Sequence, residues 1–430
     1  MDYLNYYKGC LEYNYSEQEQ VFKHNLSKDF HLFMIWEGGL SSVEDVVKNL
    51  TENFDILFRA DIQWSKEKIP ENISRFYKIR DKSLIAAHCK NKARNGKFHC
   101  IVVEDKNPKY NYRQNVSGPI RLVNTNNLAI KRDIRNEMSG NFLHSSSCPE
   151  EFYEQIYLLF DSVEIDKILQ KQLSDKIYKY NNDLIGSNGW TDLKQYFSVL
   201  NKCSNYLVQR SYHNLIESIE KDEYGIGYKD KDKDIDMICS EQSELLLASN
   251  AFRKKFEGFY VYYFNLNGTD IRIDIENCLY DSLWVKHLLN NKIYYEDGFY
   301  IPALYDYFFV LIYHESIIKK HFKKHHQESI LQIANKLDFD FFSRSLFENS
   351  EEKAKLISGY MIDRGYKVMK PSIKERKYHY SLNSEVLKYM NPKLVTFRNF
   401  SSISLYRNVF PKSLRSSIPV PLKKFVKKAL

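Results

Sequence analysis

Two short segments in which apolar residues alternate with aspartate constrain the fold of this chain more than any other feature. They are Ile235-Asp236-Met237-Ile238, directly after Asp234, and Ile271-Arg272-Ile273-Asp274-Ile275. The alternation predicts two β-strands, and residues two apart on a strand point to the same face of a sheet. Asp234 and Asp236 are therefore expected to project together, and Asp274 joins them if the second strand lies beside the first.

Three carboxylates on one sheet face predict a site for one or two Mg²⁺ ions. Hard divalent cations prefer oxygen ligands, and in phosphoryl and nucleotidyl transfer they bridge the phosphates and activate the attacking oxygen. A carboxylate inside an apolar strand is also costly unless it is paired or binds a metal. The alternative is that Asp234 only ends the charge run that begins at Lys229, because alternating charges are typical of solvated loops.

Residues of about 200 to 330 resemble the nucleotidyltransferases of the DNA polymerase beta type. That family carries a D-x-D pair on one strand and a third Asp on a neighbouring strand, and Asp234, Asp236 and Asp274 match this arrangement. The resemblance implies that all three are catalytic metal ligands. The family's Gly-Ser pair is absent, and only Gly225 and Gly227 lie nearby. Many glycosyltransferases share the D-x-D form, so sugar transfer from a nucleotide-sugar stays open.

A second candidate site lies around His144, in the stretch Asn141 to Ser147 that precedes a helix opening at Pro149. The helix expected over Leu128 to Met138 carries Lys131 and Arg135, which share a face because they are four residues apart. These cations could neutralise a phosphate near His144, which would act as nucleophile or proton shuttle. Alternatively, the histidine ends a loop and the two cations form an ordinary solvated face.

Residues of about 30 to 165 resemble nucleoside diphosphate kinase, in their β-α-β-α-β order and in the motif N-x-x-H-x-S. Asn141, His144 and Ser146 stand at the matching positions. The resemblance implies a ferredoxin-like domain in which His144 is phosphorylated and its neighbours hold the nucleotide. The family's Glu that orients the histidine is Gln155 here. An amide can hydrogen-bond the ring but cannot stabilise an imidazolium as a carboxylate does.

The composition indicates a globular chain with anionic partners. Of its 430 residues 43% are hydrophobic and 15% aromatic, which excludes wholesale disorder. A net charge of +8 favours nucleotides, phosphorylated glycans or a membrane surface, with no specific nucleic acid required. Seven scattered cysteines form no C-x-x-C pair and predict neither disulfides nor zinc. We expect a cytoplasmic protein with a peripheral membrane contact through its basic tail, Leu394 to Leu430.

These features predict an α+β chain of two α/β-type modules and a helical tail. We expect a nucleoside diphosphate kinase-like domain over 1–165, a linker over 166–190, a nucleotidyltransferase-like domain with a mixed sheet over 191–345, and a basic helical region over 346–430. The largely helical, Lys- and Gln-rich stretch Glu164 to Tyr180 is expected to connect the modules, and Ala303 to Lys320 is expected to be one apolar helix.

Chains that combine these features resemble proteins of bacterial surface-polysaccharide loci. The resemblance implies Mg²⁺-dependent phosphoryl or nucleotidyl transfer, from a nucleoside triphosphate or nucleotide-sugar to a glycan or phosphorylated acceptor, in capsule or O-antigen assembly. Two alternatives stay open. One is a glycosyltransferase that uses the D-x-D, and the other is a catalytically degenerate, nucleotide-binding accessory protein.

Overall fold

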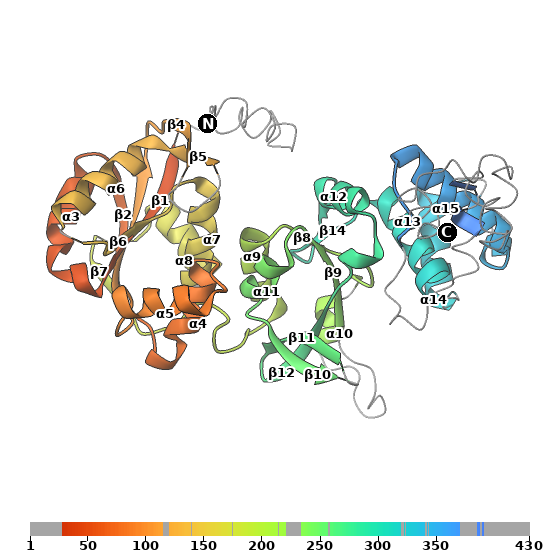
Figure 1. The fold of residues 1–430 in the computed structure, drawn as a ribbon, viewed down its shortest axis with the longest axis horizontal. Helices are drawn as coiled ribbons and strands as arrows, with labels where there is room; N and C mark the ends of the chain where they lie inside the picture. Colours follow the sequence, from red (N-terminus) through yellow and green to blue (C-terminus); the bar gives the residue numbers. More distant parts are fainter. Residues whose placement is uncertain are drawn as a thin grey trace, which may run out of the picture.

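The computed structural model describes residues 28–369, apart from 115–119, 139, 174, 214, 221–233, 257–258, 320–321, 323, 340–341 and 343, and also describes 385–387 and 389–390. Its elements form three consecutive units, which lie on the left, in the middle and on the right of Figure 1. The first two are each built on a five-stranded sheet and the third is helical. The chain is thus a mixed α and β protein with mixed sheets, as the α+β prediction requires.

The first unit is a sheet with the strand order β6-β1-β3-β2-β7 and helices on both faces. Neighbouring strands are antiparallel, except that β7 runs parallel to β2. Its strands are β1 (Asp29–Trp36), β2 (Asp55–Gln63), β3 (Lys97–Asp105), β6 (Leu143–Ser145) and β7 (Ile177–Tyr180), with a separate hairpin of β4 (Tyr110–Gln114) and β5 (Ile120–Asn124).

Two helix layers bury this sheet. One core joins β1 and β3 to α3 (Val43–Thr51) and α6 (Thr125–Glu137). A larger core on the opposite face joins the sheet to α4 (Ile69–Phe76), α7 (Pro149–Leu159) and α8 (Ser162–Leu169). The unit also holds η1 (Glu37–Ser42), η2 (Lys66–Lys68) and α5 (Lys82–Asn91). Strand β1 is buried from both sides, and its last seven residues from Phe30 to Trp36 are apolar except for His31.

The stretch after α8 differs from its prediction as a helical connector. Helix α8 ends at Leu169, and Ile177–Tyr180 forms the edge strand β7 beside β2. The Tyr178 ring stacks on Phe58 of β2 with centroids 5.3 Å apart. Packing against the sheet therefore outweighs the helix propensity of the Lys- and Gln-rich sequence. The stretch expected as a linker thus contributes a strand to the first sheet.

The second unit is a sheet with the order β10-β11-β12-β9-β8, in which only β9 and β12 are parallel neighbours. Tyr196 of the first covering helix stacks on Phe264, with centroids 4.1 Å apart. The elements are α9 (Leu193–Cys203), β8 (Tyr206–Val208), α10 (Leu215–Glu220), β9 (Asp234–Cys239), α11 (Gln242–Ala248), β10 (Phe252–Phe256), β11 (Phe259–Leu266), β12 (Thr269–Ile275), η3 (Asn277–Leu279), α12 (Ser282–Asn290), β13 (Ile293–Tyr294) and β14 (Tyr300–Ile301).

The third unit contains α13 (Leu304–Tyr313), the π-helical turn η4 (His314–Ile318), α14 (Lys324–Lys336), η5 (Arg344–Phe347) and α15 (Ser350–Arg364). The apolar helix expected over 303–320 is therefore α-helical only to Tyr313. Among the described residues, no helix is both long and apolar enough to span a bilayer. The glycines at 225 and 227 and the basic tail over 394–430 lie outside the described residues.

Arg75 of α4 joins the first two units through its buried guanidinium. It donates to the carbonyl oxygens of Ile185, Leu247 and Ala248 at 2.8, 3.1 and 3.3 Å. It also lies over the ring of Trp190, 5.7 Å from the centroid. Burial lowers the pKa of Arg75 to about 10, so the side chain stays charged at neutral pH. Charged donors make the stronger hydrogen bonds, which fixes α4 against the second unit.

Candidate functional site

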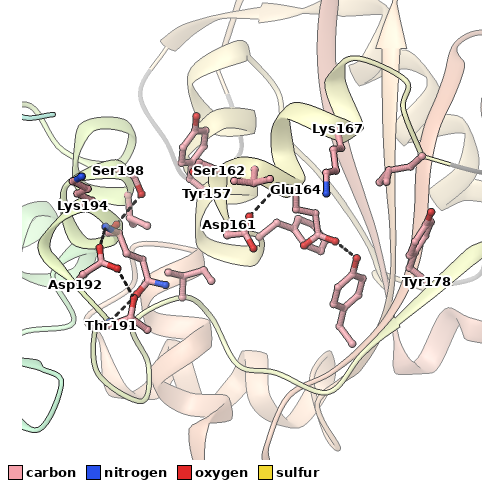
Figure 2. A pocket seen from close by; sticks show the side chains of 17 residues that line it. Tyr157, Asp161, Ser162, Glu164, Lys167, Tyr178, Thr191, Asp192, Lys194 and Ser198 are labelled. Carbon is pink, nitrogen blue, oxygen red and sulfur yellow. Dashed lines mark hydrogen bonds between the residues drawn. The ribbon is translucent and has the colours of Figure 1, made fainter.

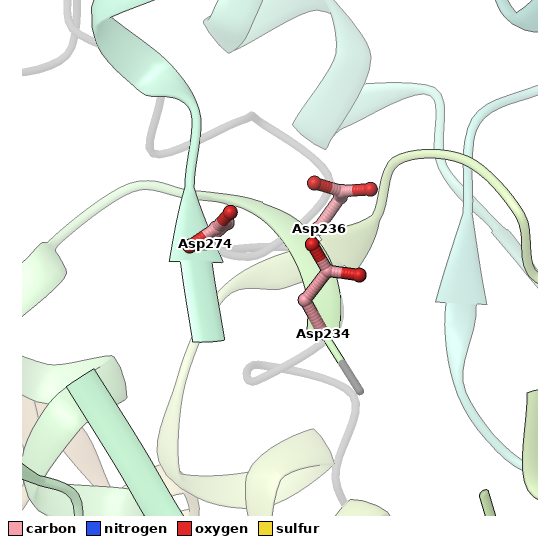
Figure 3. Close-up of side chains that lie close together, drawn as sticks. All are labelled: Asp234, Asp236 and Asp274. Atoms are coloured by element: carbon pink, nitrogen blue, oxygen red, sulfur yellow. The ribbon is translucent and has the colours of Figure 1, made fainter. Parts of the chain in front are cut away.

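The three aspartates predicted to act together do converge on one face of the second sheet (Figure 3). Strands β9 and β12 pair in parallel, with Asp236 directly opposite Asp274. Asp234 lies two residues before Asp236 on the same face. Each residue offers one carboxylate oxygen, and these oxygens all lie within 4.8 Å of one another. That spacing suits a divalent cation held by hard oxygen ligands.

The electrostatics of this triad (Asp234, Asp236 and Asp274) favour a cation. Desolvation and the negative charges of Asp236 and Asp274 raise the pKa of Asp234 to about 6. Burial raises the pKa of Asp236 above its usual range, although the charge of Arg210 opposes the shift. Carboxylates that disfavour their own ionised form are stabilised when a divalent cation neutralises them. The donor set therefore fits Mg²⁺.

Two arginines flank the triad, and the sequence predicted a role for neither. Arg210, just past β8, donates to Asp236 at 2.7 Å and to both oxygens of Glu276 at 2.7 and 2.8 Å. Arg272 of β12 donates to both oxygens of Asp274 at 2.7 Å. Arg272 could have been found from the strand alternation, because it lies two residues before Asp274. Arg210 gives no local signal.

The helical unit also reaches the triad. Tyr307 and Tyr313 of α13 pack on Tyr212 and Tyr280 of the second unit, with centroids 4.8 and 5.5 Å apart. Lys319, directly after the π-helical turn, lies close enough for its charge to act against the raised pKa of Asp236. The triad therefore lies where the second sheet meets the third unit, with cations contributed from both.

The histidine site in the first unit is built around a side-chain relay. His144 lies on β6, opposite Met34. Its Nε2 donates to Gln155 Oε1 at 3.0 Å, and Gln155 Nε2 donates to Glu151 Oε1 at 3.3 Å. The other oxygen of Glu151 accepts from the backbone N–H and the hydroxyl of Ser147 at 2.7 and 2.6 Å. The Gln155 amide is thus backed by a carboxylate one helical turn earlier, which the sequence patterns did not predict.

Burial and the charge of Lys131 lower the pKa of His144, so its ring is neutral at physiological pH. Although burial acts in the opposite direction, the hydrogen bonds from Ser147 and the charge of Lys131 hold the pKa of Glu151 below its usual value. The ring also meets the edges of Tyr77 and Phe76, with centroids 5.1 and 5.5 Å away. The histidine is held rigidly in its neutral form.

The other residues predicted around His144 are only partly gathered there. Lys131 donates to the carbonyl of Ser145 at 3.0 Å, and burial lowers the pKa of Lys131 to about 8. Arg135 donates twice to the carbonyl of Leu143, at 2.7 and 3.1 Å. Ser146 is fully buried, and its hydroxyl accepts from the backbone N–H of Leu32 at 2.9 Å. Asn141 is exposed in the loop before β6.

A separate cavity of about 700 Å³ lies among α8, β7 and α9 (Figure 2). Its lining mixes tyrosines with carboxylates and lysines. Asp161 and Asp192 cap the helices α8 and α9, and Glu164 accepts from Tyr180. None of its lining residues belongs to the triad or to the histidine site.

No protein-family model matches the chain, and no curated protein or solved structure shows significant similarity to it. The function must therefore be argued from the chemistry of these sites.

Proposed function

We propose that this protein is a Mg²⁺-dependent nucleotidyltransferase whose metal ligands are Asp234, Asp236 and Asp274. The observation that carries the proposal is the convergence of three carboxylate oxygens within 4.8 Å on the paired strands β9 and β12. Two of these residues form a D-x-D pair, and the third lies on the neighbouring strand of a mixed sheet. This is the arrangement that the resemblance to polymerase beta-type enzymes implies.

Bound Mg²⁺ would bridge phosphate oxygens and lower the pKa of the attacking hydroxyl. The chain's own residues would bind and orient the substrate. Arg210 holds the Asp236 carboxylate in place, and Glu276 balances the charge of Arg210. Arg272 lies on the same face as the triad and donates to both oxygens of Asp274, so it orients that carboxylate. Lys319 adds positive charge from the helical unit.

The acceptor in this proposal is a glycan or a phosphorylated intermediate of bacterial surface-polysaccharide assembly, as the resemblance to proteins of such loci suggests. The alternative donor is a nucleotide-sugar, with the same triad holding its diphosphate. The two reactions differ in their products, since nucleotidyl transfer releases pyrophosphate and sugar transfer releases a nucleoside diphosphate.

Phosphoryl transfer through His144 is the second candidate, and the Glu151–Gln155–His144 relay favours it. A carboxylate at the far end of the relay orients the amide and helps to fix which ring nitrogen carries the proton. The order β6-β1-β3-β2 is also that of a ferredoxin-like sheet. In this proposal the first unit is a nucleotide-binding relative of nucleoside diphosphate kinase.

The test is to incubate the full chain with Mg²⁺ and nucleoside triphosphates labelled at the α or γ phosphate, with candidate acceptors. Mg²⁺-dependent release of pyrophosphate, lost in Asp236→Asn, is the expected result. Asp166→Asn is the control, because Asp166 is an exposed carboxylate of α8 in the first unit, outside the triad. Acid-labile γ-label that disappears in His144→Ala would place the chemistry in the first unit, and pyrophosphate release that survives Asp236→Asn would refute the triad.

A further inference from the structure

The cross-strand register of the second sheet places a row of side chains beside the triad on the same face. Asp234 of β9 pairs with Arg272 of β12, Arg272 pairs with Tyr263 of β11, and Tyr263 pairs with Phe252 of β10. Directly paired residues point to the same face of a sheet. The row therefore runs from the metal ligands to the edge strand, across roughly 14 Å at about 4.8 Å per strand.

The outer end of this row is aromatic and cationic. The rings of Phe252 and Tyr263 stack, with centroids 6.3 Å apart and planes inclined by 25°. Lys254 lies over both rings, with Nζ 5.4 and 5.9 Å from the two centroids. Both rings are half-buried and Lys254 is exposed. We call Phe252, Tyr263 and Lys254 the shelf.

We propose that the shelf binds the base of the nucleotide whose phosphates the triad holds. This assignment rests on the proposed function and adds the place and the binding mode of the donor. The half-buried rings offer aromatic surface against which a planar base can stack, as bases do on aromatic side chains elsewhere. Arg272 lies between the triad and the rings and donates to both oxygens of Asp274, so it orients one metal ligand at the start of the path that the phosphates would follow.

The charges along the row match a nucleoside triphosphate. Positive charges at Arg272 and Lys254 flank the path from the metal ligands to the rings, and Arg272 pairs with Asp274. Asp270 pairs with Lys254, so the lysine head has an alternative partner when no phosphate is present. A sugar acceptor would instead offer no planar aromatic ring to cover both side chains.

The opposite face of the same strand supplies a control. Tyr260 and Tyr262 alternate with Tyr263 along β11 and therefore point away from the triad. Tyr260 is 64% exposed and lies near Arg253, so this face also combines an aromatic ring with a cation. Removing Tyr260 changes the same strand and the same side-chain chemistry without touching the shelf.

The experiment compares two ligands of the full chain by isothermal titration calorimetry in the presence of Mg²⁺. One is inorganic triphosphate, and the other is a non-hydrolysable nucleoside triphosphate analogue, tried with each of the four bases. Phe252→Ala and Tyr263→Ala should each weaken binding of the nucleotide analogue by about fivefold or more. Their affinity for inorganic triphosphate should stay within about twofold of the wild type, which also shows that the site is folded. Tyr260→Ala should bind both ligands normally.

Three outcomes would overturn the assignment. Unchanged nucleotide affinity in both shelf variants would show that the base does not bind the shelf. If the same variants then required a different acceptor concentration for activity, the shelf would be assigned to the acceptor. Equal losses for both ligands would mean that the rings only support the sheet. A wild-type chain that binds neither ligand with Mg²⁺ would refute the proposed function itself, and the shelf assignment with it.

Discussion

Replacing Asp236 with asparagine should abolish the stabilisation that Mg²⁺ gives this protein and leave its metal-free stability almost unchanged. The contacts of Asp236 determine both parts of this prediction. The asparagine amide keeps an oxygen that can accept from Arg210, which lies 2.7 Å from the Asp236 carboxylate, and Arg210 keeps its two bonds to Glu276. The change also removes one of three like charges from the triad. The weaker hydrogen bond to Arg210 lowers the unfolding free energy, and the loss of a like charge raises it. These two effects should nearly cancel, to within about 1 kcal/mol of unfolding free energy.

The metal-dependent half follows from mass action. If Mg²⁺ binds the native triad with a Kd on the order of 0.1 to 1 mM, 10 mM Mg²⁺ adds about 1.4 to 2.7 kcal/mol to the free energy of unfolding. The wild type should therefore unfold a few degrees higher in 10 mM MgCl₂ than in EDTA, and Asp236→Asn should show almost none of this shift. Asp270→Asn, which changes a carboxylate on the same strand outside the triad, should keep the full shift.

The measurement is thermal unfolding, followed by circular dichroism, of the three proteins at pH 8 with and without Mg²⁺. Two results would refute the reasoning. An equal Mg²⁺ shift in Asp236→Asn and the wild type would mean that the ion binds elsewhere. A loss of more than about 3 kcal/mol without Mg²⁺ would mean that Asp236 serves mainly to neutralise the buried Arg210, as a carboxylate in a structural ion pair does.

Three further predictions follow from the same contacts. Mg²⁺ should bind the wild type about tenfold more weakly at pH 5 than at pH 8. The reason is that protons compete with the metal as the pH falls through the raised pKa of Asp234, about 6. Calorimetry that shows no pH dependence of Mg²⁺ affinity would contradict this. Arg75→Met should lower the free energy of unfolding by about 3 kcal/mol or more in urea denaturation, since three carbonyls lose their donor. Arg80→Met, at an exposed position, should leave the free energy of unfolding almost unchanged. Gln155→Glu should raise the pKa of His144 by roughly one unit or more, because a carboxylate stabilises the imidazolium; an NMR titration in which the ring is unaffected would show that Gln155 does not control it.

Local sequence patterns predicted most of the geometry of the candidate metal site. The alternation around Asp236 and Asp274 indicated two strands, and the structure places both residues in strands whose aspartates share a face. Composition was a poorer guide over Glu164 to Tyr180. It favoured a helix throughout, but the helix ends at Leu169 and Ile177–Tyr180 forms the strand β7. Propensity is a weak signal for a short edge strand, because its stability comes from the neighbour with which it pairs.

The partners of the site residues were harder to predict from sequence. Glu151 lies one helical turn before Gln155, so helical spacing could have identified the relay behind His144. Arg210 is 26 residues before Asp236, so nothing local indicates that the two meet. The π-helical turn at His314–Ile318 was likewise not predicted, because the polar residues His314, Glu315 and Ser316 give no signal for a π-helix.

The sequence by itself determined that Asp234 and Asp236 share a face, because the direction of each side chain on a strand is fixed by the backbone of its own segment. Only the tertiary structure decided that β9 and β12 pair in parallel with Asp236 opposite Asp274. It also decided that Arg210 balances the buried charge and that Phe252 and Tyr263 lie in line with the metal ligands. Pairing and register depend on contacts between segments far apart in the chain, and these form only when the whole sheet is assembled.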